Sequence, residues 1–241
     1  MTTPKIVTRE QWLTARRELL KIEKEHTRAG DRLAEHRRAL PMVEVDTEYI
    51  FDGPDGPVTL RGLFNDHRQL IVYHFMFEPD WDEGCPSCSY LADNFTGALL
   101  HLSARDTAFA VVSRAPTEKL TTFAARMGWT FGWYSSSHTS FNDDFAVTVN
   151  PDSGAVTYNY QPAADLLASG KIWVERGELP GLSVFLRDDE RIFHTYSTYQ
   201  RGLDHLINTY NYLDLTPLGR GADDQEPHSM AWVRYHDQYA T

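Results

Sequence analysis

The chain has 241 residues, of which 41% are hydrophobic and 12% aromatic, and its formal net charge is −11. This length suits one large α/β domain or a smaller domain with extensions, and the aromatic content excludes a disordered chain. Because a surface with this much negative charge repels phosphate backbones, we expect no nucleic-acid partner. The charge is uneven, because residues 1–40 carry a net +4, which leaves −15 for the remainder.

The sequence contains no apolar run long enough to span a membrane, and its first residues, MTTPK, do not lead into an apolar stretch. We therefore expect a cytoplasmic protein that contacts no membrane. In a reducing compartment a structural disulfide is not expected. The chain has two cysteines, and they lie three positions apart.

Residues 1–40 read as an N-terminal helical arm. Thr8 and Gln11 form a capping-box pattern, and Pro41 ends the helical stretch. Gly30 is a candidate break between two helices. The apolar positions share one helical face, which predicts an arm that packs through this face. They are Trp12, Ala15, Leu19, Ile22 and Leu33. The basic arm is expected to lie against an acidic body, either its own or that of a second copy in a homodimer.

The next stretch predicts alternating strands and helices. We expect short strands at 43–45, 49–51 and 58–60, with a turn at 53–56. The run QLIVYHFMF at 69–77 is apolar enough for a central strand covered on both faces. A helix from Cys85 to about Leu102, a strand at 109–113 and a helix at 117–127 follow, an order typical of a partly parallel sheet with helices packed on it.

The later part of the chain has less regular patterns. Residues 128–178 are rich in Trp, Tyr, Ser and Asn and are interpreted as an insertion, with one strand expected at 155–160. A hairpin is expected at 182–186 and 192–196, and a helix at about 199–212. The resulting division is an arm at 1–40, a main domain at 41–215 and a tail at 216–241. Aromatic residues near Trp232 and Tyr235 are expected to contribute to the dimer contact.

The cysteine pair, Cys85-Pro86-Ser87-Cys88, carries the chemistry that the sequence predicts. Free N–H groups at the start of a helix stabilise a thiolate at Cys85, and the thiolate is the species that attacks a disulfide. Cys88 lies one turn later on the same face, where it can resolve a mixed disulfide. Three acidic side chains precede the pair and would oppose the thiolate if they lay close, namely Asp80, Asp82 and Glu83.

Three other interpretations of the pair stay open. Both thiols could be buried as small hydrophobic groups. They could form half of a zinc site, although the chain has no second Cys-x-x-Cys and no close pair of histidines. Cys85 could instead reduce peroxide, as in peroxiredoxins, although Asp82 stands where their motif has a threonine. We expect no metal and no organic cofactor.

Two long motifs resemble a bacterial family, domain of unknown function 899. The first comprises residues 69–77 and the segment WDEGCPSCS at 81–89, and the second comprises FHTYSTY at 193–199, Arg201-Gly202 and LDLTPLGR at 213–220. Shorter matches are LPMV at 40–43 and Gly53-Pro54, so the resemblance covers nearly the whole chain. It implies a thioredoxin-like α/β fold, a mixed sheet flanked by helices, and a predicted dithiol–disulfide oxidoreductase.

The resemblance also implies roles for single residues. Cys85 matches the attacking cysteine and Cys88 the resolving one, while Pro180 is the candidate for the cis-proline that faces the pair in thioredoxins. His74 and His194 are expected to be hydrogen-bonded core residues, with proton transfer to the thiols as the alternative.

We therefore expect a thiol–disulfide oxidoreductase whose partners are protein or small-molecule thiols and disulfides. The alternatives are a thiol peroxidase and a non-catalytic protein that binds a ligand on a thioredoxin scaffold. Arg201 and Arg220 are expected to pair with carboxylates, although they could also bind an acidic small molecule such as glutathione.

Overall fold

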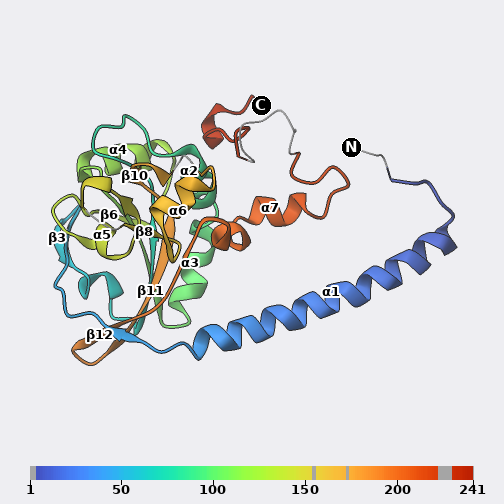
Figure 1. Ribbon diagram of the computed structural model, residues 1–241, viewed down its shortest axis with the longest axis horizontal. Coiled ribbons are helices and arrows are strands. Elements are labelled where there is room, and N and C mark those ends of the chain that lie inside the picture. The colour runs from blue at the N-terminus through green and yellow to red at the C-terminus, as the bar shows by residue number, and fades with distance from the viewer. Residues whose placement is uncertain (1–3, 154–155, 172–173, 222–229, 241) are drawn as a thin grey trace.

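The computed structural model describes residues 4–153, 156–171, 174–221 and 230–240. Figure 1 shows a rounded body built on a sheet, from which one long helix extends to the side. Among the described residues, no helix is both long and apolar enough to cross a membrane.

The main sheet has eight strands in the order β1-β12-β11-β4-β5-β6-β2-β3. Its centre is parallel, because β4 pairs in parallel with β5, and β5 with β6. The strands on either side run antiparallel, and β11 pairs with β4 so that Gly181 lies opposite His74. The strands are β1 (Val43–Glu44), β2 (Ile50–Gly53), β3 (Gly56–Thr59), β4 (Gln69–His74), β5 (Thr107–Ser113), β6 (Gly132–Ser135), β11 (Gly181–Asp188) and β12 (Arg191–Tyr199).

Helices cover the sheet because β4 and β5 are apolar on both faces, as the sequence predicts for strands buried on two sides. One face packs Tyr73 and Phe75 against the cysteine-bearing helix and its neighbours. The other face packs Leu70 and Val72 against Phe141 and Phe185. The helical elements of the body are η1 (Gly62–Phe64), α2 (Pro86–Ala92), α3 (Thr96–Ser103), α4 (Thr117–Arg126), α5 (Phe141–Asp144), η4 (Gln200–Leu206) and α7 (Asn208–Leu213).

This arrangement confirms the predicted α/β fold, a thioredoxin-like mixed sheet flanked by helices. Two predicted helices are divided in the structure. The one expected from Cys85 to Leu102 is interrupted after Ala92 and resumes as α3, and the one expected at 199–212 is a 3-10 segment followed by α7. Periodic apolar residues indicate which face is buried, but they do not reveal a turn that keeps the same face inward.

The N-terminal helix α1 (Arg9–Arg38) is continuous, so the predicted break at Gly30 is wrong. A Cβ at Gly30 would meet nothing within 4 Å, and one exposed glycine lowers helix stability by only about 1 kcal/mol. The Thr8–Gln11 capping box is present. The helix buries none of its residues, so of the two alternatives for the arm, packing along its own body is not what the structure shows.

The stretch interpreted as an insertion begins with β6, which belongs to the main sheet. From Val147 onward it contributes to a small separate apolar cluster, which includes Val147, Tyr158 and Leu166. Its short elements are β7 (Thr148–Val149), η2 (Pro151–Ser153), β8 (Thr157–Tyr158), β9 (Gln161–Pro162), α6 (Ala163–Ala168) and β10 (Gly177–Glu178). Residue 155 of the strand expected at 155–160 lies outside the described part of the chain.

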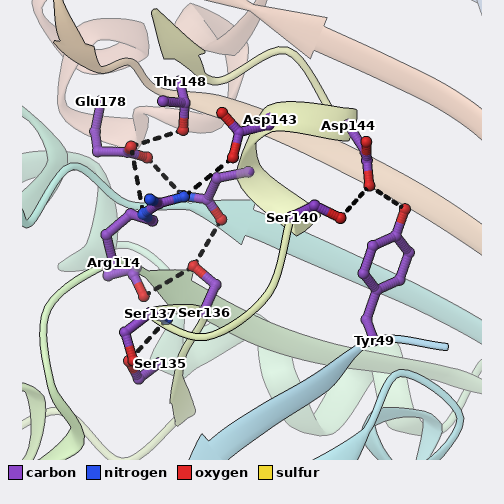
Figure 2. A network of polar contacts seen from close by, with 12 residues as sticks. Tyr49, Arg114, Ser135, Ser136, Ser137, Ser140, Asp143, Asp144, Thr148 and Glu178 are labelled. Carbon is purple, nitrogen blue, oxygen red and sulfur yellow. Dashed lines mark hydrogen bonds and ion pairs between the residues drawn. The ribbon is translucent and has the colours of Figure 1, made fainter. Parts of the chain in front are cut away.

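A polar network joins this cluster to the end of β5 (Figure 2). The carboxylate of Glu178 is buried and accepts hydrogen bonds from Asn142 at 2.5 Å and Thr148 at 2.7 Å. Arg114, just after β5, lies 3.2 Å from Asp143 and 3.9 Å from Glu178. Burial raises the pKa of Glu178, and these partners satisfy the carboxylate that burial would otherwise destabilise.

Candidate dithiol site

The central strand positions the cysteine pair. After β4 the chain continues through Phe75 and Met76, makes a loop over 78–84 and enters α2 at Cys85. The backbone of Met76 holds both cysteines: its carbonyl accepts a 3.0 Å bond from the Cys85 amide, and its amide donates to the Cys88 sulfur at 3.5 Å. Pro86 occupies the first turn of α2, where a missing N–H costs no intrahelical bond.

Two contacts fix the loop before the pair. Gly84 is buried, and a Cβ there would lie 2.6 Å from a ring carbon of Phe75, so only glycine fits without displacing that ring. The ammonium group of Lys119 donates to the carbonyl of Pro79 at 2.8 Å and to that of Trp81 at 2.7 Å. The loop is therefore tied to both α4 and the core.

The two thiols differ in exposure and in acidity. Cys85 is partly exposed, whereas Cys88 is only 2% exposed, and both are free thiols. A hydrogen bond from the Cys88 thiol lowers the pKa of Cys85 to about 7, helped by the amides of Ser87 and Cys88 and opposed by burial. Burial raises the pKa of Cys88 well above its ordinary value, and the neighbouring Cys85 adds to this effect. The first thiolate therefore forms at Cys85.

Two tyrosine side chains lie close to the buried sulfur of Cys88. The Tyr73 hydroxyl is hydrogen-bonded to Cys88, an interaction that favours the thiolate of that cysteine but is outweighed by burial. Tyr158, from β8, is close enough for a thiolate at Cys88 to raise its pKa. The Tyr158 hydroxyl also donates a 2.8 Å bond to the carbonyl of Pro180. The loop before β11 is thereby linked to the neighbourhood of the thiols.

The expectation of a cis-proline at Pro180 is wrong, because every peptide bond in the described part of the chain is trans. Pro180 does directly precede β11, whose first residue pairs with the last residue of β4. Its place in the topology is thus the expected one, but its isomer is not. The sequence cannot predict the isomer because trans is the default for most X–Pro bonds and tertiary contacts select between the two forms.

The C-terminal segment 230–240 covers the loop that leads into Cys85. The Tyr235 hydroxyl donates a 2.6 Å bond to the carbonyl of Gly84. Arg126 of α4 joins the two segments, since its guanidinium pairs with Glu83 of the loop and lies 2.8 Å from Asp237 of the tail. The Glu83 carboxylate is therefore paired with a cation, and Asp80 and Asp82 are exposed.

His74 and His194 lie on the opposite face of β4 from the cysteines. His74 is buried and stacks on Phe141, with ring centroids 5.4 Å apart. A chain of hydrogen bonds joins the two rings through Ser183 and Ser197, at 2.8, 2.8 and 2.7 Å. Burial lowers the pKa of His74 to about 3, and the nearby His194 adds to this. The prediction of hydrogen-bonded core histidines is confirmed, and neither ring reaches the thiols.

Arg201 and Arg220 pair with carboxylates, as predicted. Arg220 lies 3.1 Å from Asp204 and 2.7 Å from Asp214, and Arg201 lies 3.1 Å from Asp204. Among the described residues, no three His, Cys, Asp or Glu side chains lie together where they could hold a metal ion. The expectation of a metal-free protein stays a prediction.

A mixed sheet whose central strand leads into a helix headed by a free Cys-x-x-Cys pair defines a thioredoxin-like α/β protein with a dithiol site. The family model described as a bacterial protein of unknown function, DUF899, matches residues 1–239. The chain belongs to this family, as the two sequence motifs indicated. No curated protein matches the chain.

Several solved structures are similar in part. Peroxidoxin BcpB from Mycobacterium tuberculosis is 12% identical, with a TM-score of 0.47, covering 72% of this chain and 97% of its own. A mutant of Xanthomonas campestris peroxiredoxin Q is 14% identical, with a TM-score of 0.46 and the same coverage. A mutant of Xylella fastidiosa PrxQ is 13% identical, with a TM-score of 0.44, covering 68% of this chain and 88% of its own. Similarity at this level does not extend to activity.

The sequence analysis did not place three residues at the site, namely Tyr158, Arg126 and Tyr235. For Tyr235 it missed the contact with Gly84. Tyr235 lies 151 positions from Gly84, and no local pattern marks a contact over that separation. The only signal for Tyr235 was that aromatic residues are concentrated near the end of the chain, which we assigned to a dimer contact. Tyr158 lies in the aromatic stretch that gave no clear periodicity.

Proposed function

We propose that the protein is a thiol–disulfide oxidoreductase in which Cys85 is the nucleophile and Cys88 the resolving thiol. The Cys85 thiolate attacks a substrate disulfide, a mixed disulfide forms, and the first substrate sulfur leaves as a thiolate. Cys88 then gives up its proton and attacks the Cys85 sulfur, which releases the second substrate thiolate. The substrate gains two electrons, and the protein becomes the Cys85–Cys88 disulfide, which an external dithiol must reduce.

The asymmetry between the two sulfurs supports this assignment most directly. Cys85 is the more exposed and the more acidic thiol, as an attacking group must be, and its pKa of about 7 lies near the optimum for such a thiol. Cys88 is buried and keeps its proton until the mixed disulfide removes the negative charge from Cys85. Each thiol therefore has the property that its own step requires.

The proposed partners are protein or small-molecule thiols and disulfides, and the proposed compartment is the reducing cytoplasm. A pair that works as a reductase must be kept in its dithiol form, which a cytoplasmic reductant supplies. Pro180 is proposed to help position the substrate chain beside β11. Its carbonyl already accepts one hydrogen bond, from the Tyr158 hydroxyl, which leaves one lone pair for an amide of the substrate chain.

Peroxide reduction by Cys85 is the second candidate, because the same acidic thiol could attack a peroxide oxygen. The residue three positions before Cys85 is the exposed Asp82, which supplies no hydroxyl donor. A third candidate is a non-catalytic protein that binds a ligand with its aromatic residues at 128–178. Turnover assays with a disulfide and with hydrogen peroxide separate all three.

The test uses the Cys88→Ser and Cys85→Ser variants of the full chain. With glutathione disulfide, Cys88→Ser should accumulate a mixed disulfide on Cys85, visible as a mass increase of one glutathionyl group, whereas Cys85→Ser should not. The unmodified protein should transfer electrons from dithiothreitol to glutathione disulfide repeatedly. If alkylation and mass spectrometry of the folded protein show equal and negligible labelling of both thiols, the proposal is contradicted. Consumption of peroxide without turnover of a disulfide favours the second candidate.

A further inference from the structure

Helix α1 carries an apolar stripe that its own chain does not cover. The stripe, defined by Trp12, Leu19, Ile22 and Leu33, lies within one quarter of the helix circumference at 100° per residue. Each of these side chains is between 45% and 62% exposed. Helix propensity alone gives a solitary helix of this kind little stability, because most helical stability in proteins comes from packing an apolar face.

The opposite face of α1 is basic. It presents Arg17, Lys21, Lys24, Arg28 and Arg32, all exposed. The helix is thus amphipathic, and its arm has a net charge of +4 against −15 for the rest of the chain. Amphipathic basic helices bind either acidic protein surfaces or anionic membranes. An anionic membrane would repel a body of −15, so an acidic protein surface is the better match.

The attachment of α1 keeps the stripe away from its own body. Arg37, in the last turn, places its guanidinium 5.3 Å from the ring of Tyr196 and lines a pocket with Arg201 and Arg220. From that end the helix extends outward (Figure 1). Thirty residues of α-helix reach about 45 Å, so most of the stripe projects beyond the body.

The body has an apolar patch of its own close to that attachment. Tyr212, Leu215 and Leu218, in and after α7, are between 69% and 83% exposed. Asn211 of α7 lines the same pocket as Arg37, so the patch begins where α1 joins the body. From this attachment the outer half of α1 leads away from the body (Figure 1). If two chains paired their α1 helices antiparallel, the outer half of each helix would lie near the attachment end of the other, where its patch begins.

We propose that this chain is a symmetric homodimer in which the apolar stripe of α1 packs against the Tyr212–Leu218 patch of a second copy. Both surfaces are apolar, and the arm and the body have opposite net charges. The outer half of α1, a strip about 22 Å long and 10 Å wide, buried on both sides of two equal contacts, amounts to roughly 900 Å² in total, the size of a reversible interface. Such a contact is isologous, the usual form for homodimers.

The test measures self-association of the full chain by multi-angle light scattering and sedimentation. The unmodified protein should have twice the mass of one chain, and Leu19→Gln with Ile22→Gln should weaken association at least about tenfold. Leu215→Gln with Leu218→Gln should weaken it by a similar factor from the other side of the contact. Thr14→Gln, on the polar side of α1, is the control and should leave the mass unchanged.

Mixed crosslinking identifies the chain that covers the stripe. With equal amounts of ¹⁴N- and ¹⁵N-labelled protein, crosslinks from Lys21 and Lys24 to the body should join chains of different label. An unmodified protein that stays monomeric overturns the proposal, as does a dimer that either stripe or patch variant leaves intact. Monomers that bind phosphatidylglycerol vesicles through α1 would assign the stripe to a membrane surface instead.

Discussion

The hydroxyl of Tyr235 donates a 2.6 Å hydrogen bond to the carbonyl of Gly84, the residue directly before the proposed nucleophile. The same ring lies 5.0 Å from the Arg126 guanidinium, which also pairs with the loop through Glu83. The segment 230–240 thus holds the thiol-bearing loop in place next to Cys85.

Removing this hydrogen bond should make Cys85 more accessible. A typical net hydrogen bond contributes about 0.5–1.5 kcal/mol, so Tyr235→Phe should accelerate alkylation of Cys85 by iodoacetamide about twofold to tenfold. Tyr239→Phe removes a hydroxyl that accepts from the Arg234 amide in the same segment, and it should leave the rate near that of the unmodified protein. Equal rates in all three proteins would show that the segment does not restrict access.

The pH dependence of alkylation should report the acidity of Cys85. Because the thiolate is the reactive species, the rate should rise with pH through a midpoint of about 7. The Cys88→Ala variant lacks the thiol that donates to Cys85, so its midpoint should shift upward, toward the ordinary thiol value near 8.5. Rate measurements from pH 5.5 to 9.5 on both proteins decide this, and a midpoint unaffected by the substitution would remove Cys88 as the cause.

Substitution of Gly84 should destabilise the fold. In Gly84→Ala the new methyl group would lie 2.6 Å from the Phe75 ring, and forced overpacking of this kind costs about 1–3 kcal/mol in the free energy of unfolding. Gly97→Ala is the control, because a Cβ at that position in α3 meets nothing within 4 Å and alanine favours a helix. Urea unfolding should show a lower free energy of unfolding for Gly84→Ala and no decrease for Gly97→Ala.

Stability should fall in mild acid because of the buried histidines. Burial holds the pKa of His74 at about 3, while an unfolded histidine takes up a proton near pH 6.5. Below pH 6.5 the unfolded chain therefore binds more protons than the folded one, and the free energy of unfolding decreases by up to about 1.4 kcal/mol per pH unit for such a residue.

The histidine prediction is checked by comparing slopes. Urea unfolding between pH 7.5 and 5 should give a clearly shallower decline for His74→Gln than for the unmodified protein, whatever the absolute stability of the variant. His101→Gln, which replaces an exposed side chain, should leave the slope unchanged. If His74→Gln leaves the slope of the free energy of unfolding against pH unchanged, groups other than His74 cause the loss of stability in acid.

The purified protein should contain no stoichiometric zinc. The described residues bring no third or fourth ligand to Cys85 and Cys88, and a two-cysteine set is half of a structural zinc site. Elemental analysis of protein purified without chelators is the measurement. About one zinc per chain, lost in Cys85→Ser, would replace the redox proposal with a metal site.

The sequence predicts the features that depend on neighbouring residues. The cysteine pair, the apolar strand before it and the hairpin of β11 and β12 each follow from short patterns, and the structure contains all three. Amphipathic spacing says that a face of α1 needs a partner without saying which surface supplies it, so the cover over the stripe by a second copy stays a prediction. The polar contacts of Tyr158 and Arg126 depend on the three-dimensional arrangement of segments far apart in the chain, which no local pattern specifies.

The contact between Tyr235 and Gly84 has a consequence during synthesis. The two residues are 151 positions apart, so at translation rates of 5–20 residues per second roughly 8–30 s separate their emergence from the ribosome. Throughout that interval the nascent chain presents Cys85 without its C-terminal cover. An oxidant would therefore have its greatest effect on the newly made protein, before residues 230–240 reach the loop.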